Sequence, residues 1–274
     1  MAWVRRELDS IGIPPLKRFG QHFLIDRSVR ERLIELADLT AADTVLEVGP
    51  GLGFLTSELV RKAGRIIAIE KDRALAKYLT AKFSNQKSLT VIQGDALTTK
   101  IPDGAKIVSS PPYNISSKLV LLIMNSRFQL AALLMQEEFV RRLTAPSGSR
   151  DYGRISAMLQ SRAQAELDRR VSPDAFYPKP RISSALVTIR PSKQSLSVKS
   201  EELFLEMVRT LFTQRRRKLR GVLTRYLKDR CPNESSAILQ RIPIVDKRVY
   251  ELGPNELVVL SNHIADAIRE LRPD

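Results

Sequence analysis

A hydroxyl group, two prolines and an aromatic ring follow one another at Ser110-Pro111-Pro112-Tyr113, directly after the apolar segment 105–109. The Ser110 hydroxyl oxygen and the Pro111 carbonyl oxygen offer two acceptors for the two hydrogens of an aromatic amine. Holding those hydrogens out of the ring plane makes the amine nitrogen nucleophilic, while the prolines stiffen the loop and Tyr113 offers a face for stacking. A proline turn with a core tyrosine would be the preferred interpretation if this segment stood alone.

Glycines and carboxylates precede this loop at regular points along the chain. Gly49 and Gly51 lie between a predicted strand and a predicted helix, where glycine lets the backbone approach a ligand closely. Glu70 ends the next predicted strand and can accept both hydrogen bonds of a ribose diol. Asp95 follows a third strand, where it either accepts from the amino group of a bound adenine or bonds to its own turn. Together with Ser110, these residues predict a nucleoside site with an amine beside it.

Alternating strands and helices must position these residues. Predicted strands that alternate with predicted helices indicate a doubly wound α/β sheet with right-handed crossovers. The predicted strands are 43–48, 65–70, 89–93, 105–109, 128–135, 164–171 and 185–190, the last two forming a hairpin. The predicted helices are 54–63, 74–83, 117–124 and 137–143, with an exposed loop at 146–153.

The character of the chain changes after the last predicted strand. Residues 192–200 form a polar linker, and Leu203, Phe204 and Met207 then begin an apolar helical face. We therefore predict a domain at 1–191 that carries the chemistry and a small all-helical domain at 192–274.

The charge of the chain indicates the kind of partner. Its 274 residues carry a formal net charge of +15, which attracts polyanions and favours nucleic acid. An anionic membrane surface and a generally basic proteome remain open on charge alone. No apolar run approaches the roughly 20 residues of a membrane span. One cysteine and two histidines leave too few ligands for a usual zinc site. We expect a cytoplasmic, metal-free monomer.

Several segments resemble known methyltransferases. Residues 110–113 resemble the (Asp/Asn/Ser)-Pro-Pro-(Tyr/Phe/Trp) motif of amino-directed enzymes, and the chain from 16 to about 260 resembles the ribosomal small-subunit adenine dimethyltransferases. Residues 17–24 match that family's N-terminal signature, 176–184 its F-x-P-x-P-x-V-x-S stretch, and 212–220 a basic stretch of its helical domain. The resemblance implies a class I, Rossmann-like enzyme that uses S-adenosylmethionine and no metal.

The same resemblance implies roles for individual residues. The cofactor would be bound by His22, Leu24, Gly49, Gly51, Glu70, Asp95 and Ser110. Catalysis would fall to Ser110, Pro111 and Tyr113, and the target base would stack on Tyr113 and Phe176. RNA phosphates would be contacted by a basic helix that carries Arg215, Arg216, Arg217, Lys218 and Arg220.

The implied reaction is dimethylation at N6 of two adjacent adenosines in the loop near the 3′ end of small-subunit rRNA, during ribosome biogenesis. The partner would be that rRNA or the pre-ribosomal small subunit. The family usually has Asn-Leu-Pro-Tyr at 110–113, and we hypothesise that Ser110 suffices for both transfers but tolerates Asn. Three alternatives remain: a resistance enzyme acting on large-subunit rRNA, a DNA amino-methyltransferase, and an assembly or transcription factor without catalysis.

Overall fold

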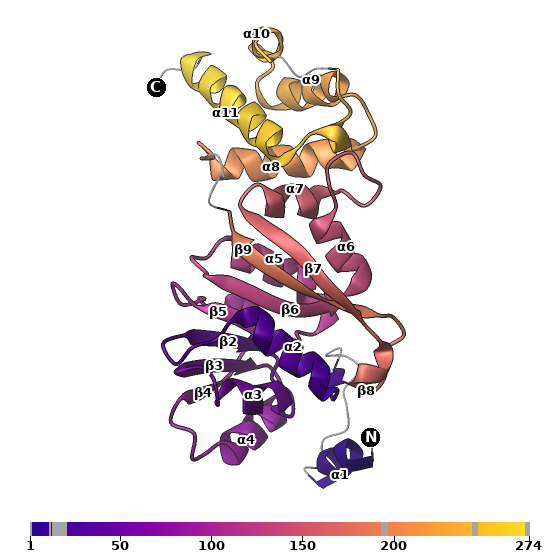
Figure 1. Ribbon diagram of the computed structural model, residues 1–274. Coiled ribbons are helices and arrows are strands. Elements are labelled where there is room, and N and C mark those ends of the chain that lie inside the picture. The colour runs from indigo at the N-terminus through magenta and orange to yellow at the C-terminus, as the bar shows by residue number, and fades with distance from the viewer. Residues whose placement is uncertain (1, 11, 13–20, 193–196, 243–245, 272–274) are drawn as a thin grey trace. The chain divides into compact units, whose positions relative to one another are not determined.

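The computed structural model describes residues 2–10, 12, 21–192, 197–242 and 246–271 (Figure 1). Contacts between Cα atoms divide the chain into two compact units. The strand unit comprises Met1–Val140 and Ala165–Pro191, and the helical unit comprises Arg141–Gln164 and Ser192–Asp274. The domain boundary expected at residue 192 stays a prediction. By compactness, residues 141–164 group with the C-terminal segment, because the helix within them packs on two C-terminal helices.

A seven-stranded sheet forms the centre of the strand unit, in the order β4-β3-β2-β5-β6-β9-β7, and β1 pairs separately with β8. The strands are β1 Phe23–Leu24, β2 Thr44–Val48, β3 Arg65–Glu70, β4 Leu89–Gln93, β5 Lys106–Ser109, β6 Leu130–Gln136, β7 Ala163–Val171, β8 Phe176–Tyr177 and β9 Ser184–Pro191. Strands β2 to β6 run parallel to one another, and β9 is antiparallel to β6. The predicted doubly wound α/β fold is confirmed.

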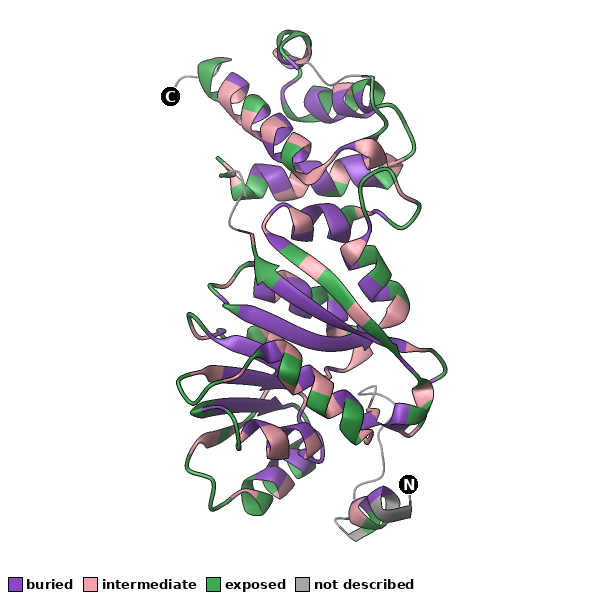
Figure 2. Cartoon of the chain, viewed as in Figure 1, coloured by how far each residue is buried: buried purple, intermediate pink, exposed green. Residues whose placement is uncertain are grey.

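Burial explains why the central strands read as continuous apolar runs. Strands β5, β6 and most of β9 are buried, whereas many residues of the edge strands β4 and β7 are exposed (Figure 2). Helix α2 lies in front of the sheet and α5 behind it (Figure 1). Val29 and Leu33 of α2 pack into one core with Val45, Val108 and Leu134 of the sheet. A parallel sheet covered on both faces has this composition.

The helices flank the sheet in the strand unit and make up most of the helical unit. They are α1 Ala2–Ser10, α2 Arg27–Ala37, α3 Phe54–Leu59, α4 Arg73–Lys82, α5 Ser116–Met124, α6 Glu137–Thr144, α7 Arg154–Gln160, α8 Glu201–Leu211, α9 Leu219–Arg230, α10 Ser235–Gln240 and α11 Pro254–Leu271. Leu203, Phe204 and Met207 are buried on one face of α8, as their spacing predicts. No helix in the described part of the chain combines the length and apolar character that a membrane crossing needs.

The prediction of a basic helix at 215–220 was wrong. Residues 215–218 form a turn, and α9 begins only at Leu219. Their main-chain groups bond to a distant strip of chain instead of to the next helical turn. Arg217 O accepts from Val249 N (3.1 Å), and Leu219 N donates to Lys247 O (2.8 Å). This non-local pairing overrides the helical propensity of arginine and lysine.

Candidate active site

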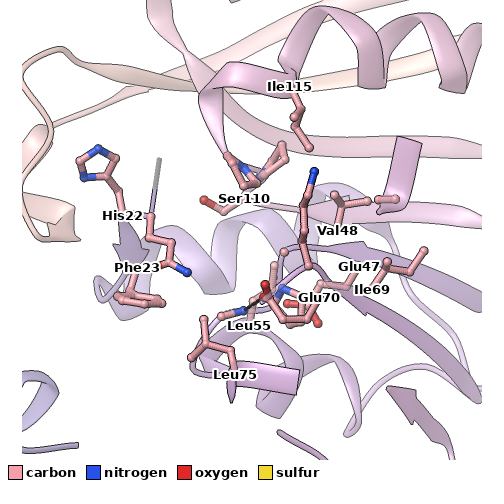
Figure 3. A pocket seen from close by; sticks show the side chains of 18 of the residues that line it. His22, Phe23, Glu47, Val48, Leu55, Ile69, Glu70, Leu75, Ser110 and Ile115 are labelled. Atoms are coloured by element: carbon pink, nitrogen blue, oxygen red, sulfur yellow. Dashed lines mark hydrogen bonds between the residues drawn. The ribbon is translucent and has the colours of Figure 1, made fainter. Parts of the chain in front are cut away.

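A cavity of about 240 Å³ lies at the carboxyl ends of β2, β3, β4 and β5 (Figure 3). Parallel strands present their carboxyl ends along one edge of the sheet, so residues that are far apart in sequence meet there. The cavity is lined by every predicted cofactor residue and by the predicted catalytic loop: His22, Leu24, Gly49, Gly51, Glu70, Asp95, Ser110, Pro111 and Tyr113. Residues 17–20 of the N-terminal signature lie outside the described residues.

The turn after β2 has no room for a side chain at two of its glycines. Gly49 and Gly51 have φ values of +69° and +60°, in the left-handed region that favours glycine. A Cβ at Gly49 would lie 3.0 Å from Pro112 Cδ, and one at Gly51 would lie 2.8 Å from Phe23 Cδ1. Both positions therefore require glycine for their backbone conformation and for close contact with the opposite wall.

Glu70 links the end of β3 to the glycine turn. Its Oε2 accepts from Gly51 N (3.0 Å) and its Oε1 from Asp72 N (2.9 Å). Asp72 in turn caps α4, accepting from Ala74 N and Leu75 N. Burial raises the pKa of Glu70, whose backbone partners oppose that shift. The carboxyl group is thus held in one orientation by two backbone N–H groups, at the position where the sequence predicts a ribose ligand.

Glu47 is a cavity residue to which the sequence reasoning assigned no role. It is only 1% exposed, and its Oε2 accepts from Thr56 Oγ1 (2.7 Å). Its other carboxyl oxygen has no hydrogen-bond partner within the described part of the chain. Burial raises the pKa of Glu47 to about 8. An acidic residue inside an apolar strand, directly before the glycines, was the signal that could have revealed it.

Asp95 has features of both interpretations that the sequence left open. Its Oδ1 accepts from Leu97 N (3.0 Å), the turn bond of the simpler interpretation, while the residue also lines the cavity. Its Oδ2 accepts from Lys71 Nζ (2.8 Å). This bond from Lys71 lowers the pKa of Asp95, so the group is an ionised acceptor at neutral pH.

The catalytic loop is anchored by a serine that precedes it. Ser109 Oγ donates to Val48 O (2.6 Å) and accepts from Val48 N (3.3 Å). This fully buried hydroxyl ties the end of β5 to the end of β2, one residue before Ser110 and one before Gly49. In Figure 3, Ser110 faces the same open space as His22, Phe23 and Glu70. Ser109 is therefore a positioning residue that the sequence did not single out.

Tyr113 is held from three sides. Its hydroxyl group lies 2.6 Å from Ser184 Oγ on β9. The His22 ring stacks on it with centroids 5.8 Å apart, and Phe176 meets it edge-on at 6.4 Å. His22 Nδ1 donates to Pro178 O (2.7 Å), so the β1–β8 pair fixes both neighbours of the tyrosine ring.

Phe176 lies in the core of the strand unit, in contact with Tyr113. Its side chain is 1% exposed, belongs to the sheet core and is not among the residues that line the cavity. Stacking of Phe176 on a target base stays a prediction. Its contact with Tyr113 supports a different contribution, namely holding the tyrosine ring in place.

Comparison with known proteins identifies this arrangement. The model of the family described as ribosomal RNA adenine dimethylase matches residues 16–253. The chain belongs to this family. It is accordingly an S-adenosylmethionine-dependent methyltransferase.

Two relatives of this dimethylase are similar over nearly their whole length. A protein of Pyrococcus abyssi, described as a probable ribosomal RNA small subunit methyltransferase A, is 38% identical over 262 residues, 94% of this chain and 95% of the relative. A protein of Methanosarcina acetivorans with the same description is 37% identical over 251 residues, 90% of this chain and 93% of the relative.

Solved structures agree on the fold. The 23S rRNA methyltransferase ErmE is 28% identical with a TM-score of 0.68, and the match covers 89% of this chain and 99% of ErmE. A dimethyladenosine transferase from Plasmodium falciparum has a TM-score of 0.81 at 23% identity, covering 90% of this chain and 98% of the other. The latter likeness shows a shared fold.

The predicted RNA-binding residues of the dimethylase are not part of the strand-unit cavity. Arg216, Arg217, Lys218 and Arg220 are exposed on the turn before α9 and at its start. Arg215 is half-buried, and its guanidinium group donates to Tyr152 O (2.5 Å) and Arg150 O (2.9 Å). Within the basic run, Arg215 thus has a structural contact, while its neighbours project to solvent.

Proposed function

We propose that this enzyme transfers methyl groups from S-adenosylmethionine to N6 of two adjacent adenosines in the loop near the 3′ end of small-subunit rRNA. One observation carries the proposal: the amine-directing loop 110–113 meets the glycine turn and Glu70 in a single cavity. The small-subunit substrate is supported by relatives that are 37–38% identical and carry that substrate in their descriptions.

The cavity has features that fit S-adenosylmethionine, which carries a positive charge. Gly49 and Gly51 line the cavity without side chains, and a Cβ at either position would meet Pro112 or Phe23 on the opposite wall. Glu47 is a buried residue, and one of its carboxyl oxygens has no hydrogen-bond partner in the described part of the chain, which suits a cationic group. Glu70 would accept from the ribose diol, Asp95 from the adenine amino group, and His22 and Leu24 would border the cofactor. When bound, the cofactor supplies a methyl group attached to a positively charged sulfur, and this sulfur leaves as a neutral thioether when the methyl group is transferred.

The loop 110–113 would prepare the nitrogen that attacks. Ser110 Oγ and Pro111 O would each accept one hydrogen of the adenine amine, so that its lone pair turns away from the ring. Tyr113 would stack on the base, its ring position set by Ser184, His22 and Phe176. Catalysis would then rest mainly on alignment, which accounts for large rate effects when reacting atoms are held at contact distance.

The second transfer asks more of Ser110, because a monomethylated amine has a single hydrogen left. A serine hydroxyl group rotates freely and can accept that hydrogen from a range of directions. We therefore propose that Ser110 serves both transfers. Loop adenines suit this chemistry because unstacked bases enter a pocket at low energetic cost.

The enzyme is proposed to act as a cytoplasmic monomer on rRNA or the pre-ribosomal small subunit, with its exposed arginines on RNA phosphates. A second candidate, methylation of an adenine in large-subunit rRNA, is favoured by the 28% identity with ErmE. It is the weaker candidate, because ErmE is less similar to this chain than the relatives whose descriptions name the small subunit.

The test is to incubate the enzyme and S-adenosylmethionine with unmethylated small subunits, large subunits and DNA in parallel. Modified adenines are then mapped by reverse-transcriptase stops and nucleoside mass spectrometry. Two neighbouring dimethyladenosines near the small-subunit 3′ end are expected. A product on large subunits or DNA alone would overturn the small-subunit assignment, and monomethyladenosine alone would limit Ser110 to one transfer.

A further inference from the structure

A second cavity, of about 350 Å³, lies wholly within the helical unit. We name it the arginine cup. Its walls come from three segments that are far apart in the chain: the loop 148–150, the turn 215–216, and residues 248 and 250. The loop is part of the exposed segment that the sequence predicted between α6 and α7, and the turn is the start of the basic run.

Main-chain hydrogen bonds join these three segments. Tyr250 N donates to Arg215 O (3.0 Å), and Gly148 N donates to Tyr250 O (2.7 Å). Tyr250 therefore bridges the basic turn and the loop with its own backbone. The Arg215 guanidinium group adds a third connection through its bonds to the carbonyl oxygens of Arg150 and Tyr152. The cup is built before any ligand arrives, which lowers the entropic cost of binding.

The charge in the cup is of one sign. Four arginines line it, Arg150, Arg215, Arg216 and Arg248, and the described lining residues include no carboxylate. The guanidinium groups of Arg150 and Arg216 are engaged by no hydrogen bond or ion pair within the described part of the chain. Ser149, on the same wall, has a buried hydroxyl group without a partner.

Other basic side chains of the helical unit contrast with this. Arg162 pairs with Glu201, Arg230 with Glu206 and Arg241 with Glu270. Lys199 and Lys247 pair with Asp266 and Glu256. The unit thus has carboxylates that pair with many of its cations, yet none lines the cup. Arginines without carboxylates, gathered on a rigid concave wall, are suited to phosphate, whose oxygens match the guanidinium fork.

We propose that the arginine cup binds a backbone phosphate of the substrate RNA, at a nucleotide other than the methylated one. This contact would set the register of the RNA on the helical unit. This inference rests on the proposed function for the identity of the RNA. The phosphate chemistry is independent of it, since a free phosphate ion would satisfy the same groups.

The test removes the unengaged guanidinium groups with an Arg150→Gln, Arg216→Gln double variant. Only the backbone carbonyls of these two residues take part in the contacts that hold the cup, so the fold is preserved. The matched control is Arg225→Gln, which removes an exposed arginine of α9 outside the cup. Binding to unmethylated small subunits and to their isolated rRNA is measured over a salt series, alongside S-adenosylmethionine affinity and melting in inorganic phosphate.

The double variant is expected to bind RNA about tenfold more weakly, with a salt slope lower by roughly one, as loss of one phosphate contact predicts. The control should stay within about twofold, and cofactor affinity should be equal in all three proteins. Stabilisation of the wild type by inorganic phosphate, lost in the double variant while RNA binding is unchanged, would overturn RNA as the ligand. A double variant that matches the control in both assays would overturn the phosphate site.

The proposed function is tested separately in the same preparations, through methyl transfer by the wild type. A wild type that methylates no small subunit, while its RNA binding still depends on Arg150 and Arg216, would remove the proposed function and leave the cup as an RNA-phosphate site.

Discussion

The two cavities of this methyltransferase differ in the sign of their charge. The strand-unit cavity is lined by three acidic residues, Glu47, Glu70 and Asp95, and one lysine, Lys71, whereas the arginine cup is lined by four arginines and no described carboxylate. The net charge of +15 is therefore not spread evenly over the binding surfaces. An acidic pocket suits a cationic methyl donor, and a basic one suits a polyanion, so one chain can hold two oppositely charged ligands with separate sites.

The cavities also differ in how they are built. Parallel strands hold the acidic cavity, and Glu70 and Ser109 bond its loops to one another. Loops that bond through their main chains hold the arginine cup. Substitutions in the first cavity should therefore change cofactor binding or chemistry and leave RNA affinity alone, and substitutions in the second should do the reverse.

The largest effect is expected for Tyr113→Ala. Loss of the stacking ring and of base alignment should lower kcat about a hundredfold while cofactor affinity stays within about twofold. Turnover is measured with small subunits, and cofactor affinity by calorimetry. Tyr113→Phe, which removes only the Ser184 bond, is the matched control and should lose much less activity. A normal rate in Tyr113→Ala would contradict the stacking role.

Glu70→Ala should weaken cofactor binding by roughly ten- to a hundredfold, since charge-assisted hydrogen bonds each contribute about 1.5–3 kcal/mol. Part of this loss comes from the freed N–H groups of Gly51 and Asp72. Calorimetric titration with S-adenosylmethionine measures the change, and the variant's RNA affinity serves as the internal comparison. Unchanged cofactor affinity would show that Glu70 is not the ribose ligand.

Glu47 should make cofactor binding depend on pH. Burial raises the pKa of Glu47 to about 8, so near neutral pH the carboxyl group is mostly protonated in the free enzyme. A bound cation favours the ionised form, and binding therefore releases a proton. The wild type should bind the cofactor up to about fiftyfold more tightly at pH near 8 than at pH near 6, because the ionised fraction of a carboxyl group with a pKa of about 8 rises from about 1% to about half over that range. Glu47→Gln should lack this increase, and identical pH profiles would contradict it.

The smallest effect is expected for Ser110→Asn, which restores the residue usual in the family. Serine presents an oxygen acceptor on Cβ and asparagine presents one on Cγ. Total methylation by the variant should therefore stay within about threefold of the wild type. Mass spectrometry separates mono- from dimethyladenosine. An inactive Ser110→Asn enzyme would contradict the view that the loop tolerates either acceptor.

Much of the acidic cavity could be predicted because its residues are set by local patterns. Glu70 ends a short strand, Asp95 and Ser110 follow the ends of two others within two residues, and parallel topology then brings these ends together. Glu47 was missed because the sequence of a short strand does not show whether its one acidic side chain lines a cavity.

Long-range pairings could not be predicted. The β1–β8 pair brings His22 to Pro178, which lies 156 positions away in the sequence. The same pair places the buried Phe176 ring edge-on against Tyr113. The basic run was assigned to a helix because composition does not reveal its pairing with residues 247–250. That pairing also brings Arg150 and Arg248 to the same cavity as the basic run.

The central claim is that the cavity at the strand ends binds the methyl donor beside the amine-directing loop. A crystal structure of the enzyme with S-adenosylhomocysteine tests it most directly. We expect the ribose hydroxyls on Glu70, the adenine amino group at Asp95 and the sulfur facing Ser110. The nucleoside bound elsewhere, or with its sulfur turned away from Ser110, would contradict the account.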